Sequence, residues 1–222
     1  MSTASLDRRA LRRQQTIDEV LDTAVEIMTE QGAGGLSLGE IARRMGIRPP
    51  SLYVYFPSKQ AIYDALFARG AQELLDTMQE ATHGFTASED LAETLLDSGT
   101  AMLRWCVAFP AYSQLLFWRP VPGFVPSPEA YAPAVEFFVS SQRAFIDLQE
   151  KGLLRADVPV DQILRDWTIV IAGITSQQLS NAPDDSFEDG RFTSALPDIV
   201  AMFCRTYGTN PPATTAISAK PN

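Results

Sequence analysis

The 222-residue sequence predicts an all-α protein, in which an N-terminal three-helix helix-turn-helix domain is linked by a long helix to a second helical domain. Three observations favour this fold class. Apolar residues recur every three or four positions along most of the chain. Strand-like alternation of apolar and polar residues is scarce. Glycine, proline and helix-capping residues divide the periodic segments from one another.

The first helix is expected at about residues 15–31, because Ile17, Leu21, Val25 and Met28 form one apolar stripe. The glycine-rich run that starts at Gly32 ends it. Residues 1–14 are expected to form a flexible basic arm. No apolar segment follows this arm, so it does not resemble a secretory signal. Its basic residues are Arg8, Arg9, Arg12 and Arg13.

The second and third helices are short and separated by a glycine turn. Ser37 and Glu40 form a capping box at the start of the second helix, and Gly46 ends it. The third helix is expected over about residues 49–55. It opens on two prolines, which suit a first turn because its N–H groups have no partner within the helix.

The rest of the chain is expected to be a linking helix and further helices. Ser58 caps the linking helix, which reaches about Thr82. We place the helix-turn-helix domain with this helix at residues 15–83, the second domain at 84–207 and a disordered tail at 208–222. The helices of the second domain are expected at about residues 90–108, 111–118, 127–150, 161–180 and 190–207.

The charge distribution suggests that the two parts have different tasks. Residues 1–70 carry nine basic and eight acidic residues, whereas residues 71–222 carry nine basic and nineteen acidic ones, for a net charge of −9. Such a balance disfavours a protein that coats nucleic acid indiscriminately, because that would need a broad basic face.

Several classes of protein are not favoured. Cys106 and Cys204 are far apart and are expected to be buried thiols, and His83 is the only histidine, so we expect no metal and no cofactor. No glycine-rich phosphate loop or Gly-x-Ser-x-Gly turn is present, so we do not expect an enzyme. No apolar run is long enough to span a membrane, and we expect a cytoplasmic protein.

The run from Ser37 to Ile62, SLGEIARRMGIRPPSLYVYFPSKQAI, resembles the tetracycline-repressor (TetR) family. The resemblance covers about residues 14–70, and Tyr55 stands where the family commonly has histidine. It implies a homodimeric transcriptional regulator, by default a repressor, that binds a palindromic operator in double-stranded DNA and is released by a small-molecule effector. The residues that carry the resemblance are Ile41, Ala42, Gly46, Leu52, Tyr53, Phe56 and Lys59.

The resemblance implies that the third helix enters the major groove of DNA. The guanidinium of Arg48 matches guanine O6 and N7, and Pro50 suits a thymine methyl group. Lys59 lies in the first turn of the next helix, where a phosphate is favoured. The expected DNA-binding residues are Ser37, Arg48, Pro49, Pro50, Ser51, Tyr53, Tyr55 and Lys59.

Alternative interpretations of these residues remain open. Tyr53 either contacts DNA or packs half-buried, and Arg43 and Arg44 either contact DNA or form a solvated face. The arginine arm either reaches the DNA backbone or is disordered. For the whole chain, the alternative is a dimeric helical interaction module that does not bind DNA.

The resemblance also implies a second domain that dimerises and binds the effector. Residues 168–174 are apolar on every face of their helix, so one side is expected to meet its own core and the other a partner subunit. Residues 196–203 form a broad apolar stripe on the last helix. We expect these two helices to form a four-helix dimer interface.

Aromatic residues crowd the segment from Met102 to Phe138 and suggest a pocket for a largely apolar or aromatic effector. A single histidine makes a metal–tetracycline site improbable. Polar anchors for the effector are Arg104, Gln114, Arg119, Thr175 and Gln178, although a surface position is expected for each. The expected effector-binding residues are Met102, Trp105, Phe109, Tyr112, Leu116, Phe124, Phe137, Phe138, Trp167 and Ile171.

Overall fold

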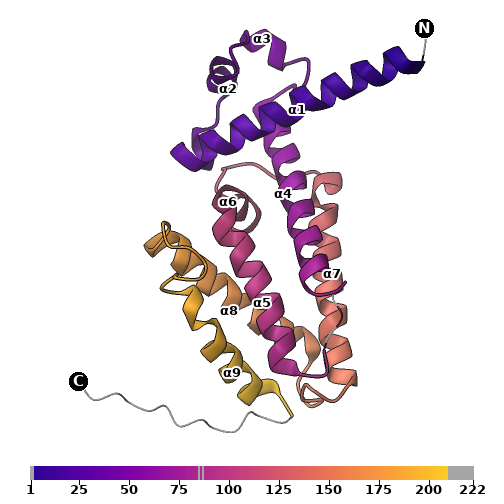
Figure 1. Ribbon diagram of the computed structural model, residues 1–222, viewed down its shortest axis with the longest axis vertical. Coiled ribbons are helices and arrows are strands. Elements are labelled where there is room, and N and C mark those ends of the chain that lie inside the picture. The colour runs from indigo at the N-terminus through magenta and orange to yellow at the C-terminus, as the bar shows by residue number, and fades with distance from the viewer. Residues whose placement is uncertain (1–2, 85, 87, 210–222) are drawn as a thin grey trace. The chain divides into compact units, whose positions relative to one another are not determined.

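The computed structural model describes residues 3–84, 86 and 88–209, and within them it confirms the predicted all-α fold (Figure 1). No β-strand occurs among these residues, although Leu154 and Gly208 form one isolated bridge. The elements are α1 (Thr3–Gln31), η1 (Ala33–Gly35), α2 (Leu38–Arg44), α3 (Pro49–Leu52), α4 (Lys59–Ala81), α5 (Leu91–Ala108), α6 (Pro110–Phe117), α7 (Pro128–Glu150), α8 (Val160–Asn181), η2 (Thr193–Ala195) and α9 (Leu196–Tyr207).

Helix α1 begins at Thr3, much earlier than expected. The arm at residues 1–14, predicted to be flexible, is therefore helical from Thr3 onward. The physical reason is that Ala, Leu, Arg and Gln are good helix formers, and neither glycine nor proline occurs between residues 3 and 31.

The short helices are positioned by their caps. The Ser37 side chain accepts a hydrogen bond from the Glu40 N–H at 3.1 Å, which confirms the N-cap of α2. Gly46 has a φ of +67°, a conformation that favours glycine and closes the turn after α2. Helix α3 ends at Leu52, earlier than the predicted Tyr55.

The described residues pack into two compact units. Of the described residues, 3–75 and 108–136 form the first unit, and 76–84, 86, 88–107 and 137–209 form the second. The predicted boundary at residue 84 divides the chain into two continuous segments. In the structure, α6 and the first turns of α7 instead pack with the N-terminal helices.

The first unit has its core between α1, α2, α3 and α4. Ile27, Ile41, Leu52 and Leu66 are completely buried there. Helix α6 approaches α4 closely at Gly70, where a Cβ atom would lie 2.6 Å from the ring of Tyr112. The absence of a side chain at Gly70 permits this approach.

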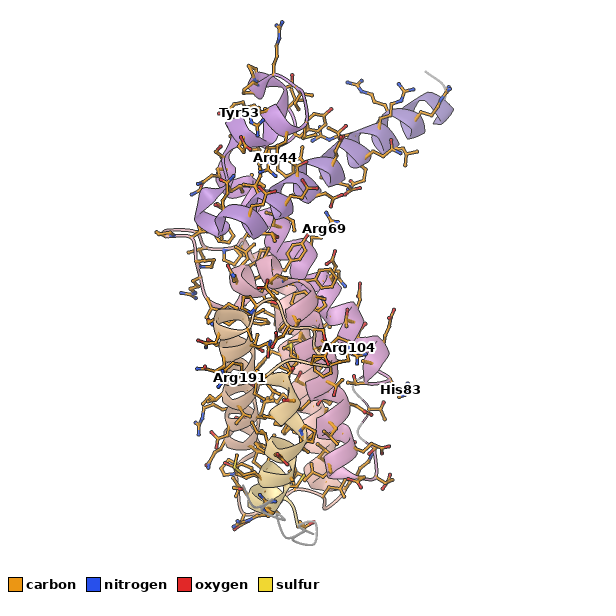
Figure 2. All side chains as sticks on the ribbon, turned by 60° about the vertical axis from the view of Figure 1, so that its left-hand side comes forward. Arg44, Tyr53, Arg69, His83, Arg104 and Arg191 are labelled. Carbon is orange, nitrogen blue, oxygen red and sulfur yellow. The ribbon has the colours of Figure 1, made fainter. Side chains whose placement is uncertain are left out.

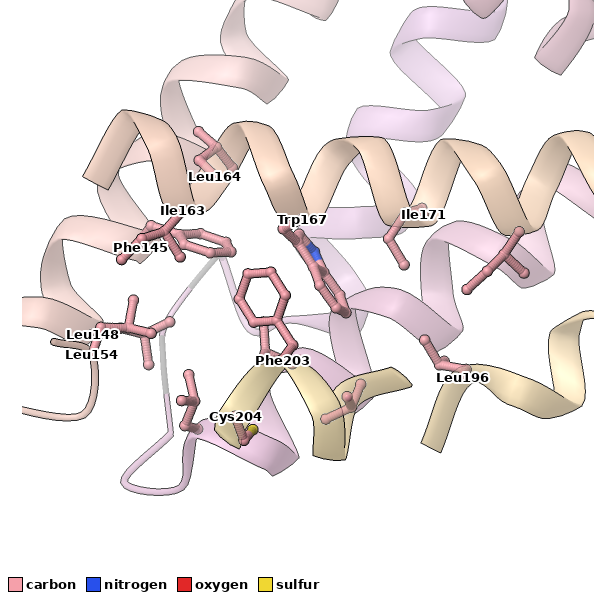
Figure 3. Packing of buried hydrophobic residues seen from close by; sticks show 14 of the residues in the cluster. Phe145, Leu148, Leu154, Ile163, Leu164, Trp167, Ile171, Leu196, Phe203 and Cys204 are labelled. Atoms are coloured by element: carbon pink, nitrogen blue, oxygen red, sulfur yellow. The ribbon is translucent and has the colours of Figure 1, made fainter. Parts of the chain in front are cut away.

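The second unit has its core between α5, α7, α8 and α9 (Figure 3). Trp167 and Phe203 pack edge to face, with ring centroids 5.2 Å apart. Cys106 and Cys204 are both buried, and neither forms a disulfide. None of the described helices is long and apolar enough to cross a lipid bilayer.

The first residues of the predicted tail are paired. Gly208 bridges to Leu154, and the Thr209 hydroxyl donates to the Gly152 carbonyl at 2.7 Å. The remainder of that predicted tail, residues 210–222, lies outside the described residues.

Candidate nucleic-acid interface

Helix α3 has an exposed edge at its N-terminal end, which we call the leading edge, and a buried opposite side. Arg48 is the N-cap and has an extended backbone, and the two following prolines occupy the first two helical positions. Leu52 and Phe56 are buried, whereas Tyr53 is 54% exposed. Tyr53 is labelled in Figure 2. The whole edge is exposed and consists of Arg48, Pro49, Pro50, Ser51 and Tyr53.

The other predicted contact residues lie beside this edge. Ser37 is exposed while it caps α2. Tyr55 is half-buried, and the guanidinium of Arg13 lies 5.3 Å from the centroid of its ring. The Lys59 ammonium lies 5.5 Å from the centroid of the Tyr63 ring. All the predicted contact residues thus belong to the first unit, on and around α3.

Arg43 and Arg44 are both held by carboxylates. Glu40 accepts from Nε of Arg43 at 2.8 Å and from Nε of Arg44 at 3.0 Å. Hydrogen bonds from Arg43 and Arg44 lower the pKa of Glu40 to about 2. Arg44 also forms a two-fold hydrogen-bonded ion pair with Glu30 of α1.

The two arginines therefore differ in role. The side chain of Arg44 is only 20% exposed and braces α2 against α1, so the interpretation as a solvated face was wrong for this residue. The side chain of Arg43 is 71% exposed. The Arg44–Glu30 pair spans fourteen positions in the sequence, so no local periodicity signals it.

A second long-range contact fastens α4 to the start of α7. The Asp64 carboxylate accepts hydrogen bonds from the Ser127 backbone N–H at 2.6 Å and from the Ser127 hydroxyl at 2.8 Å. The same hydroxyl accepts from the Ala130 N–H at 3.1 Å, so Ser127 also caps α7. Sequence reasoning missed Asp64, because its partner lies 63 positions away.

The predicted effector-binding residues fall in both units. In the first, Tyr112 is buried and Leu116 half-buried, and both face Gly70. Phe124 lies against Tyr63, with ring centroids 5.6 Å apart. Phe109 is 42% exposed.

In the second unit, most of the predicted effector-binding residues contribute to the core. Trp105, Trp167 and Ile171 are buried. Met102 is half-buried, and its sulfur lies 4.0 Å from that of Cys106. Phe137 is half-buried and Phe138 is 56% exposed.

The expected surface position was wrong for two of the five polar anchors. Gln178 is completely buried: its side-chain oxygen accepts from the Phe192 N–H at 3.0 Å, and its amide donates to the Ala182 carbonyl at 2.7 Å. Thr175 is also buried. Gln178 thus joins α8 to the segment before η2, whereas the Thr175 hydroxyl donates to the Ile171 carbonyl within α8. Of the others, Arg104 and Arg119 are exposed and Gln114 is half-buried.

Helix α8 has one buried and one uncovered side within the second unit. Ile171 and Ile174 are buried, whereas Ile169 is 61% exposed. Ala172 and Gly173 are exposed beside it. On α9, Met202 is 50% exposed.

Comparison with known proteins identifies the segment that carries this surface. Residues 20–66 match the family model described as bacterial regulatory proteins, tetR family. The matched segment contains α2, α3 and parts of α1 and α4, so every predicted DNA-contact residue lies inside it.

Two curated proteins and one solved structure extend the comparison. The chain is 27% identical over 156 residues to the HTH-type transcriptional regulator Rv1816 of Mycobacterium tuberculosis, covering 70% of this chain and 65% of that protein. It is 39% identical over 49 residues to the tetracycline repressor protein class D of Escherichia coli, covering 22% of each. A TetR family transcription regulator from Marinobacter aquaeolei superposes with a TM-score of 0.65 and 18% identity, over 90% of this chain and 98% of the other. The similarity to this solved structure shows that the two chains share a fold.

Proposed function

Because the chain belongs to the TetR family of bacterial regulatory proteins, we propose that it is a transcriptional repressor that binds operator DNA as a homodimer and is released by a small effector. The name of one relative, a tetracycline repressor, favours repression over activation. The alternative is a dimeric helical module that does not bind DNA.

The exposed leading edge of α3 carries this proposal. A helix fits the major groove, where each base pair presents a distinct pattern of donors and acceptors. Arg48 stands exposed at the N-terminal end, where recognition helices meet base edges, and Leu52 anchors the opposite side in the core. Tyr53 is exposed, and its polar hydroxyl group suits a phosphate contact.

Selection of duplexes from a random-sequence library by the full chain tests DNA binding. We expect enrichment of a two-fold symmetric sequence. Arg48→Ala should weaken binding to it by roughly 5- to 150-fold, because a base contact of this kind is worth about 1–3 kcal/mol. Tyr53→Phe should weaken it less. Arg143→Ala, which removes an exposed arginine on α7, is the matched control.

Two results would favour the helical module instead. One is that the full chain enriches no duplex. The other is that the Arg48 variant binds the enriched sequence as tightly as the unchanged chain does.

The uncovered sides of α8 and α9 support the dimer. Ile169 and Met202 are large apolar side chains with at least half of their surface exposed in the single chain, which is unfavourable in water. Ile169→Asp should shift the sedimentation velocity of the full chain from dimer to monomer. Val125→Asp, at another exposed apolar position, should not. A monomeric unchanged chain would contradict this part of the proposal.

The predicted effector-binding residues favour an aromatic effector, because most of them are aromatic themselves. Trp105 and Trp167 belong to that set, so a ligand near them should quench their fluorescence. Titration with 1-naphthol should quench this emission and release the selected duplex. The expected loss of DNA affinity is about 5- to 150-fold, typical of coupled sites. Quenching without release of the duplex would show that the ligand binds but does not regulate DNA binding.

A further inference from the structure

Four arginines lie on one side of the first turns of α1. At 100° per residue, Arg8, Arg9, Arg12 and Arg13 fall within an arc of about 140°. All four are exposed, and no acidic residue occurs from position 8 to position 17. We call these four residues the arginine face. The proposed function does not use the charges of the arginine face.

Arg13 fixes the arginine face beside the recognition helix. Its guanidinium donates to the Val54 carbonyl at 3.4 Å and stacks on the ring of Tyr55, 5.3 Å from the centroid. Both partners lie in the turn directly after α3. One end of the arginine face therefore adjoins the surface that we propose to read DNA.

The core of the first unit holds both α3 and the helix that carries the arginine face. Helix α1 continues without interruption from the arginines into Val20, Ala24 and Ile27, which are completely buried. A basic segment that is already helical loses less conformational entropy on binding than a flexible arm. This favours contacts at defined positions on a duplex.

We propose that the arginine face binds the phosphates of DNA next to the bases contacted by α3. The inference rests on the proposed function and adds a second contact element to it. Arg9 and Arg12 are exposed, whereas Arg43 and Arg44 are bound to Glu40. The exposed guanidiniums suit phosphate oxygens, which accept forked hydrogen bonds and whose neutralisation releases counterions.

An anionic membrane surface is the competing partner for a basic helix. Such a helix needs a broad apolar face opposite its charges. Here the opposite side carries Ala10, Leu11 and Gln14, and Leu11 is the large apolar side chain among them. The residues therefore favour DNA.

Binding of the full chain to two duplexes tests the inference. One duplex is trimmed to the symmetric core selected from the random library, and the other extends it by about one helical turn on each side. The variant is Arg9→Gln/Arg12→Gln. The control is Arg143→Gln/Arg191→Gln, which removes the same charge from exposed positions of the second unit.

We expect the unchanged chain and the control to bind the extended duplex more tightly than the trimmed one. The variant should lose this preference. Its log–log plot of affinity against salt should be less steep by about 2 to 4, because each lost phosphate contact reduces the slope by about 0.9 and a dimer carries each residue twice.

Each remaining outcome has a defined meaning. An unchanged salt slope and an unchanged preference for the extended duplex in the variant would overturn the inference and leave the proposed function standing. Failure of the unchanged chain to enrich any duplex would overturn both. If phosphatidylglycerol vesicles bind the unchanged chain and not the variant, while DNA binding is equal, the arginine face is a membrane contact and the inference is wrong.

Discussion

Substitution of Gly70 by alanine should destabilise the first unit, although alanine is the better helix former. A Cβ atom at this position would lie 2.6 Å from Cδ1 and 3.0 Å from Cγ of Tyr112, and 3.2 Å from Cδ1 of Leu116. Tyr112 is only 4% exposed, so its ring has little room to move away. The helices α4 and α6 must separate or the ring must leave its rotamer.

Two opposing effects determine the magnitude. Inserting a methyl group into a packed core costs about 1–3 kcal/mol. Replacing glycine by alanine within a helix contributes about 1 kcal/mol of stabilisation. The net loss is thus about 0–2 kcal/mol, and a loss of 1 kcal/mol lowers the melting temperature of a chain this long by about 2–4 °C.

Thermal unfolding followed by circular dichroism measures this effect. Gly39→Ala is the matched control, because a Cβ atom there has no neighbour within 4 Å; we expect it to be neutral or slightly stabilising. Tyr112→Leu should partly rescue the Gly70 variant, so that the two substitutions are not additive. Strict additivity, or a Gly70 variant more stable than the unchanged chain, would refute the argument from close packing.

Three further predictions concern polar groups of the first unit. Burial raises the pKa of Tyr112 to about 12, so the folded state favours the neutral phenol. The free energy of unfolding should therefore fall by up to about 2.7 kcal/mol as pH rises from 10 to 12. Urea titrations should show that the Tyr112→Phe variant lacks this part of the loss. Asp64→Ala should lower the free energy of unfolding by about 1.5–3 kcal/mol in a urea titration, because it removes the charged acceptor of the Ser127 N–H and hydroxyl. Arg44→Gln should raise the pKa of Glu30 in a carboxyl NMR titration, because the hydrogen bond from Arg44 holds that pKa below its ordinary value.

Each of these predictions has an outcome that contradicts it. Equal pH dependence of the unchanged chain and the Tyr112 variant would show that the phenol is not desolvated. Asp97→Ala, at an exposed position on α5, is the control for Asp64 and should change stability little; equal losses would remove the special role of the contact to Ser127. An unmoved Glu30 pKa would mean that Arg44 does not brace α1 and α2 in solution.

The exposed edge of α3 that we propose to bind DNA could be predicted from local sequence, because its determinants are local. The Ser37 cap, the Gly46 turn and the prolines at 49–50 act within one helical turn, and the structure confirms each of them. Leu52 and Phe56, four positions apart, are buried, whereas Ser51, Tyr53 and Pro57 beside them are exposed.

The tertiary structure alone decided which distant residues meet. The pairs Arg13–Val54, Arg44–Glu30 and Asp64–Ser127 join positions 14 to 63 residues apart, and the side-chain periodicity of a helix carries no information on such partners. For the same reason the sequence did not indicate that residues 108–136 pack with the N-terminal helices, or that Gln178 is buried. Local chemistry determined the helices and the exposed edge of α3, and long-range packing determined what holds them in place.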